Sequence, residues 1–332
     1  MAISDKKSAP LEFEQPLAVL AQQIEALEKQ LADNPNPELD ADIAHLREQY
    51  KHLKRSLYSN LRPIDHLALA RHAQRPYTRD YFDRWDDDWM ELHGDRQGSD
   101  DQAMTCGLLE LDEFAVVAVG TQKGRTLRDK QQCNFGMPQP EGYRKALRLF
   151  QHAEKFRLPV VTLIDTPGAY PGMTAEEHNQ SQAIAMNLRE LAGLTVPVVA
   201  VVTGEGGSGG ALGIGVANRI LMLEHSVYSV ISPEGCASIL WRSAEKVSEA
   251  CQSMKMTARE LLAQGVVDEV IEEPLGGAQH DHEFAARATR EAIVRHLREL
   301  SSLSPEKLRS DRQGKFRKVG SFMEDKRTES NG

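Results

Sequence analysis

The sequence predicts an α/β fold preceded by a helical hairpin, and two patterns in the chain support this prediction. Between residues 17 and 57, apolar side chains recur at alternating three- and four-residue steps, which is typical of helices with one apolar seam. After residue 103 the pattern changes to short apolar runs separated by helical segments, which indicates strands alternating with helices. With 332 residues, 40% of them hydrophobic, the chain can bury a large core as one domain, or as a domain with an appendage.

The predicted hairpin consists of two apolar seams joined by a turn that contains proline. One seam contains Leu17, Leu20, Ile24, Leu27 and Leu31, and the other contains Leu39, Ile43, Leu46, Tyr50, Leu53 and Leu57. The residues between them, "DNPNP", cannot continue a helix, because proline lacks the N–H donor and restricts the residue before it. We expect the seams to pack on each other, on the rest of the chain, or on a partner subunit.

The body follows a polar stretch at 71–103 and begins with two apolar runs on either side of Asp112 and Glu113, a pattern typical of a β-hairpin. The runs "PVVTLID", "VPVVAVV", "RILML" and "YSVIS" predict further strands. The expected helices span about 142–156, 175–191, 244–264 with an interruption around Met256 and Thr257, and 283–300.

Composition and termini favour a protein of the cytoplasm. The N-terminal "MAISDKKSAP" has no apolar signal segment, and no run approaches ~18 apolar residues, so neither export nor a membrane span is expected. A formal net charge of −9 argues against a general nucleic-acid-binding surface. The cysteines form no CxxC pair and no metal-ligand spacing, so we expect reduced thiols and no metal site; they are Cys106, Cys133, Cys236 and Cys251.

The C-terminal residues 301–332 are an exception to the acidic balance. Basic side chains gather here among few apolar ones, namely Lys307, Arg309, Arg312, Lys315, Arg317 and Lys318. This composition predicts a solvated, disordered tail, with an electrostatic docking arm as the alternative.

Residues 204–215, "GEGGSGGALGIG", contain seven glycines directly after an apolar run. A dinucleotide fingerprint fits Gly204, Gly206 and Gly209, with Glu224 as the acidic residue, but the helix that follows is short and rich in glycine. A P-loop does not fit, because no lysine followed by serine or threonine comes after the glycines.

A nucleophile elbow also fits this segment, since Gly206, Ser208 and Gly210 satisfy GxSxG after a strand. Asp268 then precedes His280 and His282 in the order that a serine hydrolase requires, although both histidines lie in a polar loop. A further interpretation needs no side chain: the backbone amides of Gly206 and Gly207, near a helix start, can hold an oxyanion that develops during a reaction.

Six motifs in one order carry a family resemblance. They are "QKGR" at 122–125, "NFGMPQPEGYRKALRL" at 134–149, "IDTPGAYPG" at 164–172, "GEGGSGGALGIGV" at 204–216, "YSVISPEGCASILW" at 228–241 and "EPLGGA" at 273–278. Together they closely resemble the carboxyltransferase alpha subunit of multi-subunit bacterial and plastid acetyl-CoA carboxylase, from the helical hairpin to about residue 300.

This resemblance implies a crotonase-like (ClpP/crotonase) spiral of ββα units over 76–300, after a helical extension over 1–75. It implies transfer of a carboxyl group from carboxybiotin, on the biotin carboxyl carrier protein, to acetyl-CoA, which gives malonyl-CoA for fatty acid biosynthesis. The implied partners are a carboxyltransferase beta subunit that bears a zinc ribbon, the carrier protein and biotin carboxylase. The absence of CxxC pairs fits the alpha chain rather than the beta chain.

The resemblance also implies roles for particular residues. The amides of Gly206 and Gly207 would hold the ureido oxygen of biotin, where a Cβ would crowd the bound group. We further expect Gly168 and Gly172 to shape a loop at a strand end, Pro233, Glu234 and Gly235 to border the biotin pocket or a subunit interface, and Lys123 and Arg125 to meet CoA phosphates or a partner carboxylate. Ile239, Leu240 and Trp241 are expected in the core.

The chain departs from the family pattern at two places. Cys133 stands where relatives carry an arginine before "NFGM", and Thr121 stands where a histidine commonly precedes "QKGR". The alternatives that stay open are a stand-alone crotonase-type acyl-CoA hydratase or isomerase, the serine hydrolase, and a non-enzymatic scaffold that recruits partners through its hairpin and tail. No glutamate pair typical of the first alternative is evident near the glycines.

Overall fold

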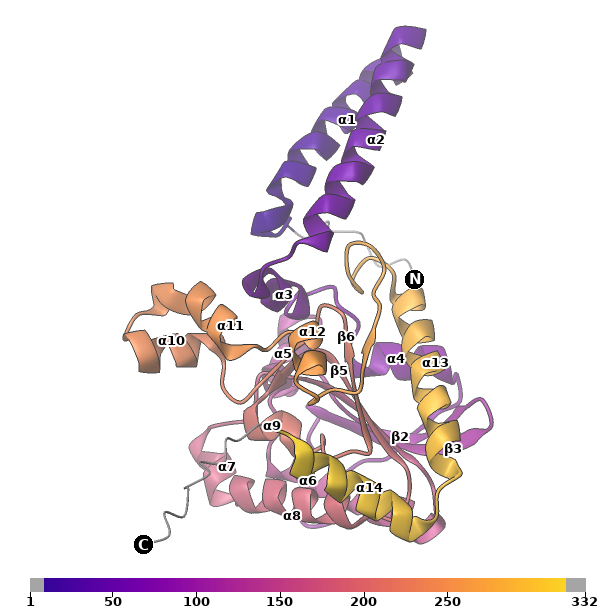
Figure 1. Cartoon of the computed structure of the whole chain (residues 1–332), viewed down its shortest axis with the longest axis vertical. Helices are drawn as coiled ribbons and strands as arrows, with labels where there is room; N and C mark the ends of the chain where they lie inside the picture. The colour runs from indigo at the N-terminus through magenta and orange to yellow at the C-terminus, as the bar shows by residue number, and fades with distance from the viewer. Residues whose placement is uncertain (1–8, 321–332) are drawn as a thin grey trace, which may run out of the picture.

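The computed structural model describes residues 9–320 of the chain. A helical hairpin projects from an α/β body, in which one mixed sheet lies between two layers of helices (Figure 1). The hairpin consists of α1 (Gln15–Asp33) and α2 (Pro37–Ser59). Every residue of the two predicted seams is buried or half-buried, and α1 packs along α2, so the seams face each other.

The described residues form an eight-stranded sheet in the order β1-β2-β3-β4-β5-β6-β8, and β7 pairs with the last residues of β5. Strands β1, β2 and β3 are antiparallel, whereas β3, β4, β5, β6 and β8 run parallel. Their bounds are β1 (Met90–Glu91), β2 (Met104–Leu111), β3 (Phe114–Thr121), β4 (Val160–Thr166), β5 (Val198–Gly207), β6 (Arg219–Leu223), β7 (Val227–Ser229) and β8 (Glu269–Ile271). The predicted hairpin around Asp112 is confirmed, since Leu111 pairs with Phe114.

Both faces of the sheet are buried, which explains the continuous apolar runs in its strands. Along β5, Val198 and Val202 belong to one core cluster, while Val199 and Val201 belong to the cluster on the opposite face, as the period of two requires. Helices α6 (Pro140–Phe156) and α8 (Gln180–Gly193) cover the first face. Helices α4 (Thr78–Trp85) and α13 (His282–Ser301) cover the second face (Figure 1).

Most of the remaining helical segments are short, but α14 has 14 residues. They are η1 (Glu12–Glu14), α3 (Pro63–Ala70), α5 (Leu127–Gln132), η2 (Asn134–Gly136), α7 (Met173–Glu177), α9 (Ser208–Leu212), α10 (Pro233–Trp241), η3 (Ala244–Lys246), α11 (Val247–Met254), α12 (Ala258–Ala263) and α14 (Pro305–Lys318). Among the described residues, no helix is long and apolar enough to cross a membrane.

One predicted helix is interrupted where the sequence predicted continuity, and another is interrupted where the sequence predicted a break. The helix expected over 175–191 is two helices, α7 and α8, because Asn179 adopts a left-handed conformation with φ of 66°. The interruption expected around Met256 is confirmed, and Lys255 with φ of 52° ends α11 there.

The prediction of a disordered tail is wrong for residues 305–318, which form α14. Arg312 and Leu308 are buried in this helix, and the Arg312 guanidinium donates hydrogen bonds to the carbonyl oxygens of Leu191, Leu194 and Val196 at 2.7–2.8 Å. In the sequence the six basic residues form one charged run, whereas in the structure Arg312 lies among buried backbone carbonyl groups. Residues 321–332 of the predicted tail lie outside the described residues.

Candidate functional site

The candidate site lies at the carboxyl ends of the parallel strands β4 and β5. Such an edge is where α/β folds commonly bind their ligands. Strand β4 ends at Thr166 and passes into the loop 167–172, while β5 ends at Gly207 and passes directly into α9. The loop and the glycine segment therefore meet at one edge of the sheet.

Gly206 and Gly207 are the last two residues of β5, and both are buried. Gly206 is paired with Thr166 of β4 on one side and with Tyr228 of β7 on the other, and Gly207 is paired with Ser229. The next residue, Ser208, is exposed and adopts a left-handed conformation with φ of 53°. The strand therefore turns sharply into the short helix α9.

The glycines permit a close approach of protein backbone. A Cβ atom on Gly207 would lie 2.1 Å from the carbonyl oxygen of Pro167, and one on Gly210 would lie 2.3 Å from the backbone nitrogen of Ala169. At Gly206 a Cβ would lie 2.9 Å from the Tyr228 ring. We expected a Cβ to crowd a bound group, but these positions are crowded by the chain itself.

Gly168 and Gly172 shape the neighbouring loop in different ways. Gly168 has a φ of 153°, and a Cβ there would meet no atom of the described residues within 4 Å. The space beside Gly168 is thus open at the site where the loop contacts Gly210. Gly172 is the N-cap residue of α7, and a Cβ there would lie 2.3 Å from the Tyr170 ring.

A buried carboxylate, Asp165, connects β4 to β5. Its Oδ1 atom accepts hydrogen bonds from the Lys123 Nζ atom at 2.6 Å and from the Glu205 backbone N–H at 2.9 Å. Gly204 provides the space, since a Cβ on that residue would lie 2.3 Å from Asp165 Oδ1. Lys123 therefore has a partner within the chain, and it sits beside the glycine segment.

A second charged group, Arg71, joins β5 to α10. Its guanidinium donates to both carboxylate oxygens of Glu205, at 2.6 and 3.0 Å, and to those of Glu234, at 2.6 and 3.3 Å. Burial is the largest single effect and raises the pKa of the Glu234 carboxyl, but the hydrogen bonds and the charge of Arg71 together outweigh it, so the pKa lies below its usual value. The Glu234 carboxylate therefore stays ionised near neutral pH.

The first turn of α10 places Pro233, Glu234 and Gly235 at this edge. Pro233 is buried at the first helical position, and the Ser232 hydroxyl caps the helix by accepting the Gly235 N–H at 3.1 Å. Helices α10 and α11 form an arm that extends away from the body (Figure 1).

The core prediction for the last turn of α10 is wrong. Ile239 and Leu240 are 69% and 63% exposed, and Trp241 is 39% exposed. Their apolar run could be read from the sequence, but the arm carries them outward from the sheet (Figure 1).

Arg125 contributes to the structure of the segment before α4. Its guanidinium donates to the carbonyl oxygens of Ala73 and Arg75 at 2.8 and 3.0 Å, pairs with Asp80, and lies 4.1 Å from the centre of the Tyr77 ring. The Arg125 guanidinium therefore has hydrogen-bond and ion-pair partners within this protein. Whether it also meets a phosphate stays a prediction.

The structure contradicts the hydrolase hypothesis, because Asp268 and Ser208 lie at opposite ends of the parallel strands. Asp268 accepts the Ile220 N–H and pairs with Lys315 at the amino ends of the parallel strands, whereas Ser208 follows their carboxyl ends. Ile220 pairs with Ala200, so the extended strand from there to Ser208 separates the two sites by roughly 25 Å. The His282 ring, for its part, is hydrogen-bonded to the Gln74 carbonyl oxygen.

The dinucleotide interpretation also lacks structural support. Helix α9 has five residues, and backbone from the loop 167–172 occupies the glycine side of the strand end. Glu224, the expected ribose-binding residue, already has a partner in the chain, since its carboxylate accepts a hydrogen bond from Arg259 at 2.7 Å.

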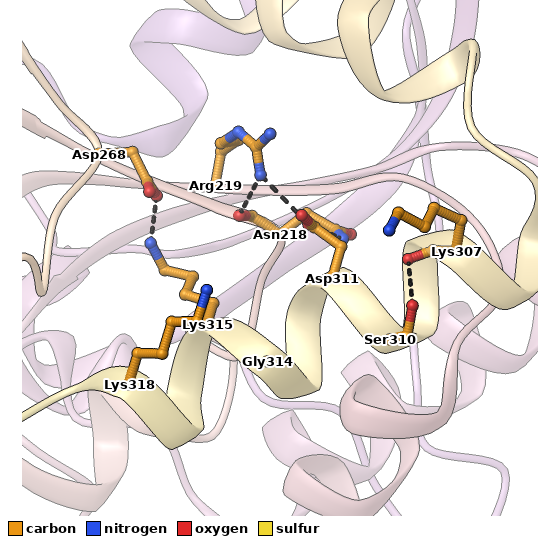
Figure 2. A pocket seen from close by; sticks show the side chains of 9 residues that line it. All are labelled: Asn218, Arg219, Asp268, Lys307, Ser310, Asp311, Gly314, Lys315 and Lys318. Carbon is orange, nitrogen blue, oxygen red and sulfur yellow. Dashed lines mark hydrogen bonds and ion pairs between the residues drawn. The ribbon is translucent and has the colours of Figure 1, made fainter.

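A charged pocket of roughly 360 Å³ lies at the opposite edge of the sheet, beside α14 (Figure 2). In it Asp268 pairs with Lys315, and Asp311 pairs with Arg219 (Figure 2). Each pair is neutral in itself, while Lys307 and Lys318 add positive charge to the lining, and the pocket lies far from the glycine segment. Within residues 9–320, no group of three or more His, Cys, Asp or Glu side chains is arranged to hold a metal ion.

Comparison with known proteins places the chain. A profile of the family described as acetyl co-enzyme A carboxylase carboxyltransferase-like matches residues 10–320. The chain belongs to this carboxyltransferase family. Curated relatives named acetyl-coenzyme A carboxylase carboxyl transferase subunit alpha include that of Synechococcus elongatus, 50% identical over 319 residues, 96% of this chain and 97% of the relative. The relative of the same name in Geobacter metallireducens is 50% identical over 314 residues, 95% of this chain and 98% of the relative.

Solved structures of carboxyltransferases share the fold of this family member. The transcarboxylase 12S hexamer core, with methylmalonyl-coenzyme A bound, matches 69% of this chain and 42% of its own chain, with a TM-score of 0.57 and 22% identity. The Pseudomonas malonate decarboxylase hetero-tetramer, in complex with coenzyme A, matches 71% of this chain and 91% of its own, with a TM-score of 0.56 and 15% identity. The crotonase-like fold is therefore confirmed.

The two departures from the family pattern have local explanations. The Thr121 hydroxyl accepts the Asp165 backbone N–H at 2.6 Å, so it helps to place the buried carboxylate. Cys133 is buried and its thiol donates to the Gln102 carbonyl oxygen at 3.4 Å. Burial raises the pKa of this thiol to about 11, which keeps it protonated and unreactive near neutral pH.

Three residues of the site were not singled out from the sequence. Asp165 belongs to the motif "IDTPGAYPG", but the sequence assigns no role to it, to Arg71 or to Glu205. Glu205 interrupts a run of small and apolar residues at the end of a strand, which is a usable signal, because a buried charge requires a partner. Its partner, Arg71, lies 134 residues earlier, where spacing carries no information.

Proposed function

We propose that this chain is the alpha subunit of an acetyl-CoA carboxylase carboxyltransferase, which transfers a carboxyl group to acetyl-CoA to give malonyl-CoA. Relatives that share half of its residues over nearly their full length carry this name, and that identity carries the proposal. Formation of malonyl-CoA would be the first committed step of fatty acid biosynthesis. The carboxyl donor would be carboxybiotin on the biotin carboxyl carrier protein.

The residues at the end of β5 fit a donor that develops negative charge. Carboxybiotin supplies the carboxyl group and a ureido oxygen on which charge grows as that group departs. We assign the backbone N–H groups of Gly206 and Gly207 to that oxygen, because fixed donors stabilise developing charge with little reorganisation. The open space beside Gly168 supports this assignment, since a ligand can approach the glycine segment from there.

The neighbouring residues would complete the pocket without covalent chemistry. Pro233, Glu234 and Gly235 start α10 at the same edge, and Gly172 ends the facing loop. Lys123 lies beside β4 and would supply positive charge close to the bound anion. The acyl-CoA would sit mainly on a homologous beta subunit that carries a zinc ribbon, and biotin carboxylase would recharge the carrier.

Reconstitution tests this function directly. Mixing the chain with its cognate beta subunit should produce decarboxylation of malonyl-CoA in the presence of free biotin, while either chain alone should be inactive. Activity of this chain alone on an acyl-CoA would favour a stand-alone hydratase or isomerase. No activity with the cognate partner would contradict the carboxyltransferase function.

Ser208 separates the carboxyltransferase from the hydrolase interpretation. We expect Ser208→Ala to keep kcat/KM of the reconstituted enzyme within about threefold, because the proposed chemistry uses backbone donors at this turn. The measurement is malonyl-CoA decarboxylation by the variant, together with fluorophosphonate labelling of the unmodified chain. Covalent labelling of Ser208, or a loss of activity near the 10⁴-fold scale of a missing triad member, would favour a hydrolase.

A further inference from the structure

Arg71 holds two carboxylates that arrive from separate elements. Its own position is fixed at the end of α3, where its backbone N–H caps the helix. Glu205 comes from β5 and its side chain is 7% exposed, whereas Glu234 comes from the first turn of α10 and is 48% exposed. One guanidinium thus connects the N-terminal helical segment, the central strand and the α10–α11 arm.

The ion pair between Arg71 and Glu205 also restrains the backbone of β5. Glu205 immediately precedes Gly206, and its backbone N–H is already fixed by Asp165 at 2.9 Å. With the carboxylate held by Arg71 and the amide held by Asp165, the residue is restrained at both ends. Two glycines follow, and glycine restrains the backbone least of all residues, so their orientation depends on their pairing with β4 and β7 and on what holds the chain before them.

The fold alone does not require this arrangement. An ionised carboxylate at a buried strand end is costly unless it is paired, and an alanine or valine at 205 would serve a sheet equally well. An arginine rather than a lysine is required here, because the planar guanidinium can bind two carboxylates at once. The ion pair is therefore explained by what it positions rather than by stability.

We propose that Arg71 is a positioning residue, which orients the amides of Gly206 and Gly207 through Glu205 and sets α10 against the same site through Glu234. This inference rests on the proposed function for its catalytic consequence, but not for its structural one. Without Arg71, Glu205 would turn toward solvent and α10 would lose its attachment to the strand. The glycine amides would then be displaced from the oxygen that they stabilise.

The catalytic test compares variants of the reconstituted enzyme. We expect Arg71→Lys to lower kcat roughly 100-fold, the scale of a 1 Å misplacement, with KM for malonyl-CoA changed less than about threefold. Glu234→Gln, which releases α10 but not β5, should give a smaller loss of kcat. Arg84→Ala is the matched control, because Arg84 forms a surface ion pair with Glu283 at 2.7 Å and lies away from the site.

Hydrogen–deuterium exchange provides a test that needs no activity. In the full chain, Arg71→Lys should raise exchange in peptides that cover 203–212 and 228–241 at least threefold, while Arg84→Ala should leave both unchanged. If the wild-type enzyme turns over with the beta subunit and Arg71→Lys has a near-normal kcat, the positioning role of Arg71 is overturned while the proposed function stands. Absence of wild-type turnover would overturn the proposed function. The exchange result would still decide whether Arg71 positions the strand. Unchanged exchange in Arg71→Lys would reject the positioning role.

Discussion

Single glycines in the segment 204–215 differ in what they make possible. Gly207 and Gly210 allow the loop after β4 to lie directly on the end of β5, and Gly204 makes room for the Asp165 carboxylate. No close contact requires a glycine at 209, since a Cβ there would lie 3.9 Å from its nearest neighbour, Ile184 Cδ1. The cluster is therefore a set of individual requirements and not a uniformly flexible loop.

This difference predicts opposite outcomes for two substitutions in one motif. Gly207→Ala should cost about 1–3 kcal/mol of unfolding free energy, since the new methyl group overlaps the Pro167 carbonyl oxygen, and it should lower kcat together with stability. Gly209→Ala should change both quantities little and is the matched control. Urea unfolding and malonyl-CoA decarboxylation measure the two effects. If the two variants have the same unfolding free energy and the same kcat, the close backbone contact at Gly207 is not the reason for a glycine there.

At the scale of elements, α14 closes one edge of the sheet. Its buried Arg312 donates to three backbone carbonyl groups and to the Asn218 Oδ1 atom at 2.6 Å. Burial lowers the pKa of this guanidinium to about 10, so it is still charged at neutral pH. The helix is thus attached through one side chain that satisfies the ends of α8 and the start of β5.

Replacement of that side chain should loosen the edge. Arg312→Met should destabilise the chain by at least ~3 kcal/mol, because several carbonyl groups would be left buried without a donor. Arg309→Ala, on the exposed side of the same helix, should fall within about 0.5 kcal/mol of wild type. Chemical denaturation of both variants gives the answer. A loss below 1 kcal/mol for Arg312→Met would mean that α14 is only loosely bound.

The sequence predicted most of the elements, because their signals are local. The two hairpin seams, the strands β4, β5 and β6, and the helices α6 and α13 follow from apolar periodicity. Contacts made by single polar residues across the fold were missed. In the sequence Arg312 is one charge of a basic run, and Arg71 and Arg75 fall within the helical extension predicted over 1–75, although Arg75 is fully buried in the body.

The candidate site was predicted in part, and the missing part has a physical reason. Motif resemblance pointed to Gly206, Gly207 and the loop 167–172, which do lie together. The ion pairs that surround them join the segment after β3 to β4, and the end of α3 to β5 and α10, so no spacing along the chain reveals them. Exposure of Ile239 and Leu240 was equally hidden, since an apolar run does not tell a core helix from a projecting one.

At the scale of the whole molecule, a buried ion pair joins distant parts of the chain. The Arg75 and Glu273 side chains are both 0% exposed, and Arg75 also donates to the Thr203 carbonyl oxygen at 2.6 Å. Glu273 accepts the backbone N–H groups of His225 and Ala278 at 2.9 and 2.7 Å. The N-terminal segment, the central strand and the loop before α13 are therefore fixed at one point.

This pair predicts a pH-dependent effect of a single substitution. Burial is the largest single effect and raises the pKa of the Glu273 carboxyl, but the charges of Arg75 and His225 and the hydrogen bonds from both residues together outweigh it, so the folded-state pKa lies below the usual value of 4.5. The pair therefore stabilises the folded chain above pH 4.5, and this contribution is lost as the pH falls below that value. Glu273→Gln should cost about 3–5 kcal/mol at pH 7, with a smaller difference from wild type at pH 3.

Urea unfolding at the two pH values measures the difference. Glu283→Gln removes the carboxylate of a surface pair whose side chain is 75% exposed, and it should cost less than about 1 kcal/mol at either pH. A penalty for Glu273→Gln that stays constant between pH 7 and pH 3 would contradict the assignment of a depressed pKa.

The attachment of α14 has a consequence for synthesis of the protein. The carbonyl groups of Leu191, Leu194 and Val196 leave the ribosome long before the arginine that pairs with them. Until Arg312 has been translated and has emerged, this edge must remain hydrated, and the nascent chain cannot complete its core. Proteases can therefore distinguish a polypeptide that stops early from a finished one by the open edge that it retains.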